Sequence, residues 1–225
     1  MELITEQRGL SALQCTNGQH APVTGQGKQE NHLFPVFLKA ENLRLLLVGG
    51  GAVALEKLCA VLRNAPEAAI KIVALHISVE LRLKASLYPN IHLQERAFRP
   101  ADLQDTDWVI VAVNNKEVSG QIRRQSRAAG ILVNVADAPD LCDFYLGSIV
   151  GKGSLKIGIS TNGKSPTIAK RIKEMFQSVI PDELEDVLHK MQEIRERLNG
   201  DFASRVEKLN NITQVFIDQD SAPAC

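Results

Sequence analysis

The sequence predicts an α/β fold built on a doubly wound parallel sheet. Two observations support this. Apolar runs of strand length alternate with helical patterns over 43–135. A glycine turn, Gly49-Gly50-Gly51, joins the first of these runs to the first helical pattern. With 225 residues, 44% of them hydrophobic, the chain is long enough for one large or two small globular domains.

The first unit is an expected strand at 43–48, the glycine turn and a helix at 53–64. Residues 49–54 fit the pattern G-x-G-x-x-A. In this pattern Gly49 makes the tight turn, Gly51 lets the backbone approach a pyrophosphate, and Ala54 lets helix and strand pack closely. The helix N-terminus offers free N–H groups and partial positive charge to phosphates. This arrangement is typical of a Rossmann-like dinucleotide site.

One part of the dinucleotide fingerprint is missing. An Asp or Glu should end the second strand and bind the ribose hydroxyls. That strand, expected at 70–75, ends at Leu75 and runs into His76, with no carboxylate at its tip and no Arg for a 2′-phosphate. Ribose recognition is therefore expected to use backbone or neutral side chains, and the choice between NAD and NADP stays open.

The rest of the sheet follows the same alternation. Ligands of such sheets bind beyond the carboxyl ends of the strands, and Asn114 and Asp137 follow two of those ends. Gly130 is expected to cap the helix before the last strand. The expected elements are a helix at 79–87, a strand at 91–94, a turn at 102–105, a strand at 108–113, a helix at 116–129 and a strand at 131–135.

After Asp137 the pattern changes to a hairpin and helices. Strands are expected at 144–150 and 155–160, joined by 151–154, then helices at 166–179, 182–198 and 201–218. This second part is too small for an independent core and should dock on the first domain or on a second subunit. The predicted domains are a polar, disordered extension at 1–31, a dinucleotide-binding domain at 32–143, a dimerisation and substrate region at 144–180, and a helical region at 181–225.

Composition restricts the partners. Lys plus Arg and Asp plus Glu both number 26, which argues against bulk nucleic-acid binding. No apolar run reaches membrane-span length, and the N-terminal residues do not resemble a signal peptide. Four cysteines without a C-x-x-C pair suit the cytoplasm, and five scattered histidines predict no metal site.

Four stretches stand in an informative order: 48–54 (VGGGAVA), 133–139 (VNVADAP), 144–150 (FYLGSIV) and 159–166 (ISTNGKSP). Together they resemble the precorrin-2 dehydrogenase family of sirohaem synthesis, whose members often also act as sirohydrochlorin ferrochelatases. The resemblance covers about 32–200, and Lys57 fits the family's glycine-turn pattern. The methyltransferase domain of larger members lies outside it.

The resemblance implies NAD-dependent oxidation of precorrin-2 to sirohydrochlorin, followed by insertion of ferrous iron, which is then a substrate and not a cofactor. It places the family's important aspartate on Asp137. It places the residues lining NAD on Ala52, Val53, Leu75 and His76, beside Gly49, Gly51 and Asn114.

Asp137 has two interpretations. As a carboxylate past a strand end, it is placed to act as a general base, both when precorrin-2 is oxidised and when pyrrole protons leave. Alternatively, Asp-Ala-Pro simply begins a turn. The resemblance favours the base. Asp140 and Asp143 are interpreted as turn and solvent residues in preference to iron ligands, with a transient role toward iron as the alternative; neither has the spacing of a stable metal site.

The loop at 160–166 also has two interpretations. It could bind the carboxylates of precorrin-2 at a basic helix N-terminus, or it could be an ordinary capped helix start. Ser165 is the expected N-cap, Pro166 the first helical residue, and Thr161 stands where some family members have Ser. The predicted substrate-binding residues are Ser160, Thr161, Asn162, Lys164 and Ser165.

The apolar positions of the C-terminal helices indicate packing or subunit contact, so a homodimer is expected. A rival from another functional class is a non-catalytic NAD-sensing module, in which dinucleotide binding controls partner binding.

Overall fold

The computed structural model describes residues 31–198 and 202–213. Every helix and strand described below lies after Leu33. The predicted extension at 1–31 lies outside the described residues except for Asn31, and the part of the last predicted helix beyond Thr213 also lies outside them. The predicted domain boundaries stay predictions.

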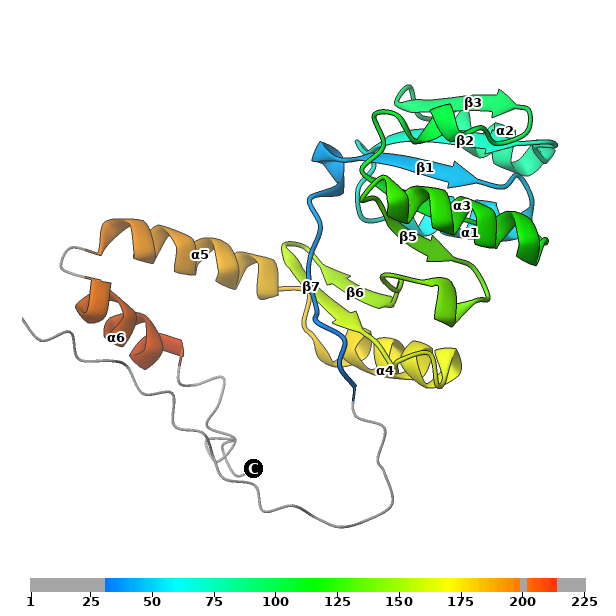
Figure 1. The fold of residues 1–225 in the computed structure, drawn as a ribbon. Coiled ribbons are helices and arrows are strands. Elements are labelled where there is room, and N and C mark those ends of the chain that lie inside the picture. The colour runs from blue at the N-terminus through cyan, green and yellow to red at the C-terminus, as the bar shows by residue number, and fades with distance from the viewer. Residues whose placement is uncertain (1–30, 199–201, 214–225) are drawn as a thin grey trace, which may run out of the picture. The chain divides into compact units, whose positions relative to one another are not determined.

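A five-stranded parallel sheet forms the first part, in the order β3-β2-β1-β4-β5 (Figure 1). Its strands are β1 (Arg44–Val48), β2 (Ala69–Ala74), β3 (Ile91–Glu95), β4 (Trp108–Val111) and β5 (Leu132–Val135). Its helices are α1 (Ala52–Leu62), α2 (Val79–Ala85) and α3 (Lys116–Ala128), with short 3-10 turns η1 (Ala40–Asn42), η2 (Pro100–Leu103) and η3 (Pro139–Leu141).

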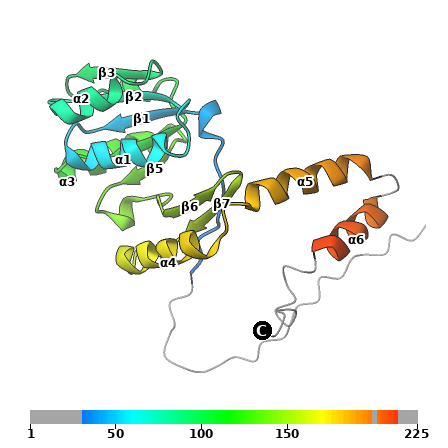
Figure 2. The ribbon, with the colours of Figure 1, turned by 180° about the vertical axis from the view of Figure 1, so that it is seen from behind.

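The core has two layers, one on each face of the sheet. Leu45 and Leu47 of β1 point into the layer covered by α1 and α2, and Leu46 and Val48 point into the layer covered by α3. Figure 1 shows α3 in front of the sheet, and Figure 2 shows α1 and α2 on the other side. Both faces of the central strands are therefore buried, which explains their continuous apolar runs. The predicted doubly wound sheet is confirmed.

The second part begins with an antiparallel hairpin, β6 (Ser148–Lys152) and β7 (Leu155–Ile159), followed by α4 (Pro166–Val179), α5 (Leu184–Arg197) and α6 (Phe202–Thr213). The predicted four-residue link at 151–154 is wrong: the turn consists of Gly153 and Ser154. Glu185 of α5 fixes this turn, because its carboxylate accepts the Ser154 N–H at 2.6 Å and the Ser154 hydroxyl at 2.7 Å. Lys152 forms an ion pair with Asp182.

The predicted strand start at Phe144 is also wrong, because packing sets the position of the segment before β6. The Asp143 N–H donates to the Val133 carbonyl at 2.7 Å, and the buried Asn134 side chain donates to the Phe144 carbonyl at 2.8 Å. The rings of Phe144 and Trp108 lie 5.8 Å apart. This segment therefore runs back along β5 and protects an otherwise open sheet edge.

The turn expected at 102–105 is present at Gln104 and Asp105, but its first two residues belong to η2, and Asp102 in η2 is only 3% exposed. Its carboxylate accepts two bonds from the Arg96 guanidinium, at 2.7 and 2.6 Å, and one from the Arg99 N–H at 2.8 Å. The bonds from Arg96 come first among the causes that hold the pKa of Asp102 below its usual value. Asp102 thus fastens β3 to η2.

We expect Asp102→Asn to lower the free energy of unfolding at pH 7 by about 1–3 kcal/mol, because Arg96 loses a charged partner. A carboxyl with a lowered folded-state pKa stabilises the fold above its unfolded pKa of about 3.9 and loses that effect as pH falls through the folded value. Urea unfolding between pH 7 and pH 2 should show the two proteins converging at the acid end. A constant difference would contradict the charge-based explanation.

Candidate functional site

The glycine turn after β1 is closely packed between two neighbouring strand ends. Gly49 has φ +133°, and a Cβ there would lie 2.2 Å from the Ala112 carbonyl oxygen. A Cβ on Gly50 would lie 2.0 Å from the His76 carbonyl oxygen. The tight turn predicted at Gly49 is confirmed. The equal need for glycine at position 50 follows from packing against the β2 end, which the motif alone did not indicate.

Gly51 differs, because no atom lies within 4 Å of a Cβ built there. It is the N-cap of α1, which begins at Ala52, one residue before the predicted start. No side chain caps α1, whereas Ser78, Asn115 and Ser165 cap α2, α3 and α4. The first N–H groups of α1 therefore have no side-chain cap, and Gly51, Ala52 and Val53 are exposed, as a phosphate site requires.

On the β2 side of the turn lie Leu75 and His76, the two residues predicted to line the dinucleotide. Both are exposed, Leu75 by 79%. The chain then returns to the glycine turn, where the Ser78 N–H donates to the Gly50 carbonyl at 2.9 Å. Leu75 and His76 are thus held beside the turn with their side chains available to a ligand.

A carboxylate that the sequence reasoning missed lies at this end of the sheet. Glu95, the last residue of β3, is the register partner of Ala74. Its carboxylate accepts the Ile77 N–H at 3.0 Å and an Arg82 N–H at 2.6 Å, and it lies 3.6 Å from the His76 imidazole. These two donors, Ile77 first, hold the pKa of Glu95 below its usual value. The predicted strand ended at Gln94, and no prediction placed β3 beside β2.

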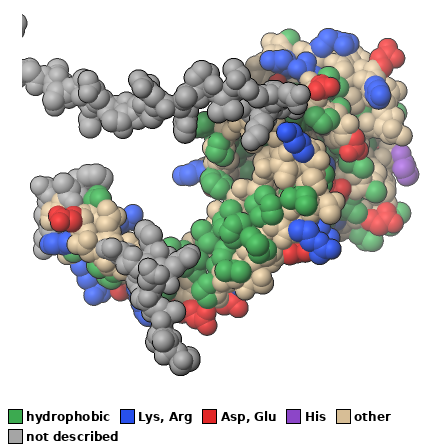
Figure 3. All heavy atoms as spheres, turned by 90° about the horizontal axis from the view of Figure 1, so that it is seen from below, with side chains coloured by type: hydrophobic (Ala, Val, Ile, Leu, Met, Phe, Trp, Pro, Cys, Tyr) green, Lys and Arg blue, Asp and Glu red, His purple; other side chains and the backbone are tan. Residues whose placement is uncertain are grey.

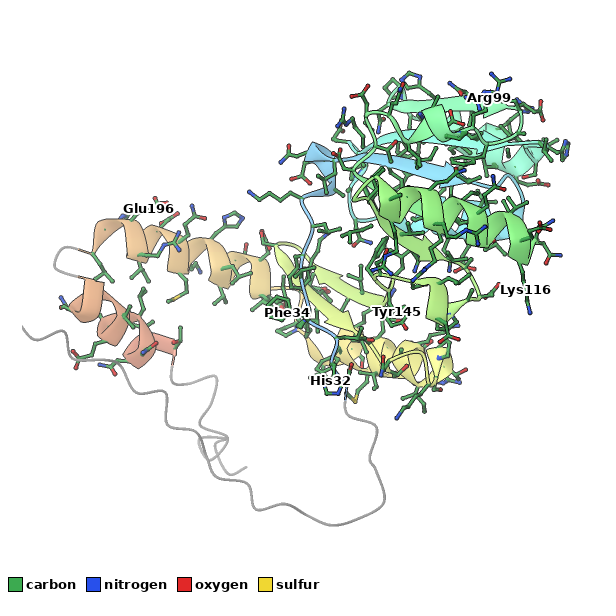
Figure 4. The ribbon with its side chains drawn as sticks, viewed as in Figure 1. His32, Phe34, Arg99, Lys116, Tyr145 and Glu196 are labelled. Carbon is green, nitrogen blue, oxygen red and sulfur yellow. The ribbon has the colours of Figure 1, made fainter. Side chains whose placement is uncertain are left out.

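On the other side of the turn, Asn114 follows β4 and Asp137 follows β5, and both are exposed. Asp137 has φ +58°, in the left-handed region that Asp and Asn tolerate better than most residues. The Ala136 N–H donates to the Val111 carbonyl at 2.8 Å, so the turn is held against β4. Lys116, the first residue of α3, projects from the same edge (Figure 4). Asp137 therefore occupies a turn, and it also stands at the edge beyond the strand ends where sheets of this kind bind ligands.

Cys142 helps to fix the Asp137 turn. Its sulfur lies 3.2 Å from both the N–H nitrogen and the carbonyl oxygen of Val135, and 3.4 Å from the Ala138 carbonyl oxygen. Burial raises the pKa of this thiol, so it remains neutral and can donate. Asp143 is exposed as a residue, as predicted, but its side chain turns inward: the carboxylate accepts the Val133 N–H at 3.1 Å and lies 3.6 Å from the Arg127 guanidinium.

The loop between β7 and α4 is closed by its own hydroxyl groups. Thr161 Oγ1 lies 3.2 Å from the Ser165 nitrogen, and Ser165 Oγ accepts the Ile168 N–H at 3.2 Å, which confirms the predicted N-cap. The Ser160 hydroxyl accepts the Asn162 N–H. Asn162 and Gly163 both have positive φ. Within the described residues, no hydrogen bond joins this loop to the glycine turn or to Asp137.

Together, the predicted cofactor residues lie along one edge of the sheet. The glycine turn is central, Leu75 and His76 lie on its β2 side, and Asn114 and Asp137 lie on its β4–β5 side. The chain reverses direction across the sheet between β1 and β4, and this is the switch point where such sheets bind their ligands.

Residues 36–148 match a family described as putative NAD(P)-binding. The chain belongs to this family. The matched residues of this NAD(P)-binding chain include the glycine turn, the β2 end and Asp137. Residues 152–178, covering most of the hairpin and α4, match a second family described as sirohaem biosynthesis protein central.

Curated relatives are named siroheme synthase. The protein from Nitrosomonas europaea is 37% identical over 66% of this chain and 31% of its own length. The protein from Psychrobacter cryohalolentis is 32% identical over 81% of this chain and 34% of its own length. The chain thus spans about a third of these relatives. A solved structure titled SirC, precorrin-2 dehydrogenase, has the same fold, with TM-score 0.65 and 24% identity over 83% of this chain and 93% of that one.

Among the residues that the structure describes, no group of three or more His, Cys, Asp or Glu side chains is arranged to hold a metal ion. No helix in that part of the chain has the length and apolar character needed to cross a membrane.

Proposed function

We propose that this chain oxidises precorrin-2 to sirohydrochlorin with NAD as the hydride acceptor. The observation that carries the proposal is the uncapped start of α1 behind the open Gly51, on the same sheet edge as Asp137. The siroheme synthase relatives and the precorrin-2 dehydrogenase fold match support the choice of substrate.

The residues present fit a dinucleotide. The space above Gly51 and the N–H groups of Ala52 and Val53 would receive the pyrophosphate. The adenosine half would lie toward Leu75 and His76, and the nicotinamide half toward Asn114 and Asp137. NAD bound in this way supplies the hydride acceptor.

In this proposal Asp137 accepts the proton that must leave precorrin-2 when a hydride is removed from a ring carbon. The carboxylate is exposed, and its turn is fixed by the hydrogen bonds of Ala136 and Cys142, so its position is set before substrate arrives. The exposed Asn114 lies on the neighbouring strand end and would help to orient the reacting ring.

The carboxylates of precorrin-2 would be recognised by the loop at 160–165 and the start of α4. The hydroxyls of Ser160, Thr161 and Ser165 accept bonds within the loop, so Lys164 and Lys170 supply the positive charge for these carboxylates. Arg171 lies beside Lys170 in a shallow hollow, but its guanidinium is already paired with Glu174 at 3.0 Å. The Asn162 amide is available as a further donor.

We expect Lys164→Glu to raise the apparent KM for precorrin-2 about tenfold with little change in kcat, because it replaces attraction for a carboxylate by repulsion. Steady-state kinetics would measure this, with Lys190→Glu on α5 as a control for an exposed lysine outside the loop. An equal KM for precorrin-2 in both variants would indicate that the loop is an ordinary capped helix start and does not bind substrate.

Insertion of ferrous iron into sirohydrochlorin is the second proposed activity, with iron as substrate. The pyrrole N–H protons must leave, and Asp137 is placed to accept them as well. Incubating the protein with sirohydrochlorin and ferrous iron, with metal-free buffer as the reference, tests this directly. Sirohaem formation at the uncatalysed rate would contradict the proposed iron insertion without affecting the proposed dehydrogenation.

The second part of the chain would be completed by another copy, giving a homodimer. Ile168, Met175 and Val179 of α4 are more than half exposed. Figure 3 shows hydrophobic side chains gathered on the underside of the molecule. Beside the hairpin, a groove has both apolar and polar lining residues, and its apolar ones are Phe37, Leu155, Leu188, Met191 and Leu209. Such exposed apolar area is typical of a subunit interface.

Light scattering after gel filtration should give about twice the chain mass of 24.7 kDa. Met175→Glu should shift the protein toward monomer, because it puts a charge into the apolar patch, whereas the exposed Gln177→Glu on the same helix should not. A wild-type monomer at micromolar concentration would contradict the dimer.

The cytoplasm is the proposed compartment, because Cys59 and Cys142 are free thiols and a reducing compartment keeps them so. Neither nucleic acid nor a membrane is proposed as a partner, since the formal net charge is zero.

The deciding experiment is incubation of purified protein with precorrin-2 and NAD, following NADH and sirohydrochlorin by absorbance. Equal amounts of both products are expected. Tight NAD binding without tetrapyrrole binding or turnover would instead support the non-catalytic sensor.

A further inference from the structure

The end of β2 lacks the acidic residue that usually binds the ribose, but the neighbouring strand end has one. In Rossmann domains an acidic residue at the end of the second strand binds the ribose hydroxyls. Here β2 ends at Ala74 and continues into Leu75 and His76. The neighbouring strand β3 ends in Glu95, in register with Ala74. A carboxylate is therefore present one strand further from the glycine turn.

Hydrogen bonds connect Glu95 to the glycine turn. Its carboxylate accepts the N–H of the buried Ile77 at 3.0 Å, and the next residue, Ser78, donates its N–H to the Gly50 carbonyl at 2.9 Å. Glu95 is thus held against the loop that carries Leu75 and His76, and its side chain remains 40% exposed.

The bonding state of Glu95 suits hydroxyl groups. A carboxylate can accept about four hydrogen bonds, and the protein supplies two, from Ile77 and Arg82. Both bonds favour the ionised form, so the pKa of Glu95 lies below its usual value. Around neutral pH the group can therefore accept bonds from a diol but cannot donate to a phosphate.

The charges nearby argue against a 2′-phosphate. A phosphate dianion would lie beside the Glu95 carboxylate and be repelled. Arg82, the guanidinium that could attract it, is bound to Glu95 at 2.6 Å. The His76 imidazole likewise lies 3.6 Å from the Glu95 carboxylate.

We infer that Glu95 is the ribose-binding carboxylate of this site, supplied by β3 in place of β2, and that it makes the site select NAD over NADP. This inference rests on the proposed function, because it assumes that the glycine turn binds a dinucleotide.

The test is calorimetric titration of NAD and NADP into the protein without tetrapyrrole, for the wild type, Glu95→Gln and Glu80→Gln. Glu95→Gln keeps an oxygen for the Ile77 N–H but removes the charge. We expect wild type to favour NAD at least tenfold, and Glu95→Gln to reduce the NAD-to-NADP preference by about tenfold or more. Glu80, an exposed acid on α2, is the matched control and should leave the preference unchanged.

Arg82→Ala provides a second variant if Glu95→Gln fails to fold. Because Glu95 stays in place, NAD should still bind within about threefold of wild type and remain preferred. An NAD-to-NADP preference in Glu95→Gln equal to that of wild type would overturn the inference. So would a wild type that prefers NADP, if Arg82→Ala abolishes that preference. Both outcomes would leave the proposed function intact. Binding of neither dinucleotide by wild type would overturn both.

Discussion

Replacing Asp137 by Asn is expected to lower the rate of precorrin-2 dehydrogenation by about 10²- to 10⁴-fold, because the amide cannot accept the departing proton. Asn is the informative substitution, since it tolerates the left-handed backbone at φ +58° about as well as Asp does. An Ala at this position would add backbone strain to the loss of the base. Single-turnover kinetics with precorrin-2 and NAD would measure the chemical step.

Two controls separate a base from a turn residue. NAD affinity and thermal stability should stay near wild-type values in Asp137→Asn, because the exposed carboxylate supports neither the sheet core nor the α1 N-terminus. The nearby exposed Asp140→Asn should retain normal turnover. Near-normal turnover in Asp137→Asn would show that Asp137 is a turn residue and not the general base.

The sequence was sufficient to predict the sheet elements, because their signals are local. Strands buried on both faces give continuous apolar runs, and the glycine turn, Ser165 cap and Gly130 φ of +73° follow from backbone requirements of neighbouring residues. The segment before the hairpin was misjudged for the opposite reason. Phe144 is an aromatic residue of the kind common in strands. Its position is nevertheless set by contacts with Trp108 and Asn134, which are not its neighbours in sequence.

The candidate site shows the same division. Gly49, Gly51 and Asp137 could be found from motifs, because each follows the end of a recognisable strand. Glu95 and Gly50 could not be interpreted, because their roles depend on which strand ends lie side by side. Glu95 gains its role from the pairing of β3 with β2, and Gly50 from the approach of the His76 carbonyl. Long-range pairing of this kind leaves little trace in a single sequence.

Substitutions in the glycine turn should also have large effects, on NAD affinity at Gly51 and on stability at Gly49, because the two glycines are needed for different reasons. Gly51→Ala should fold normally, with stability within about 1 kcal/mol of wild type, since its φ of −96° suits Ala and no atom lies within 4 Å of the new Cβ. NAD affinity should nevertheless fall about tenfold or more, because that Cβ occupies the space through which a pyrophosphate would approach the α1 N-terminus. Thermal unfolding and calorimetric titration with NAD would measure the two effects separately.

Gly49→Ala is the matched comparison, because there the cost falls on folding. At φ +133° an Ala is strained, and its Cβ would meet the Ala112 carbonyl oxygen at 2.2 Å, so the free energy of unfolding should drop by more than about 2 kcal/mol. NAD binding should be lost together with the fold. Stable, NAD-binding Gly51→Ala protein would show that the pyrophosphate does not approach this turn, and the cofactor would then have to bind elsewhere on the sheet edge.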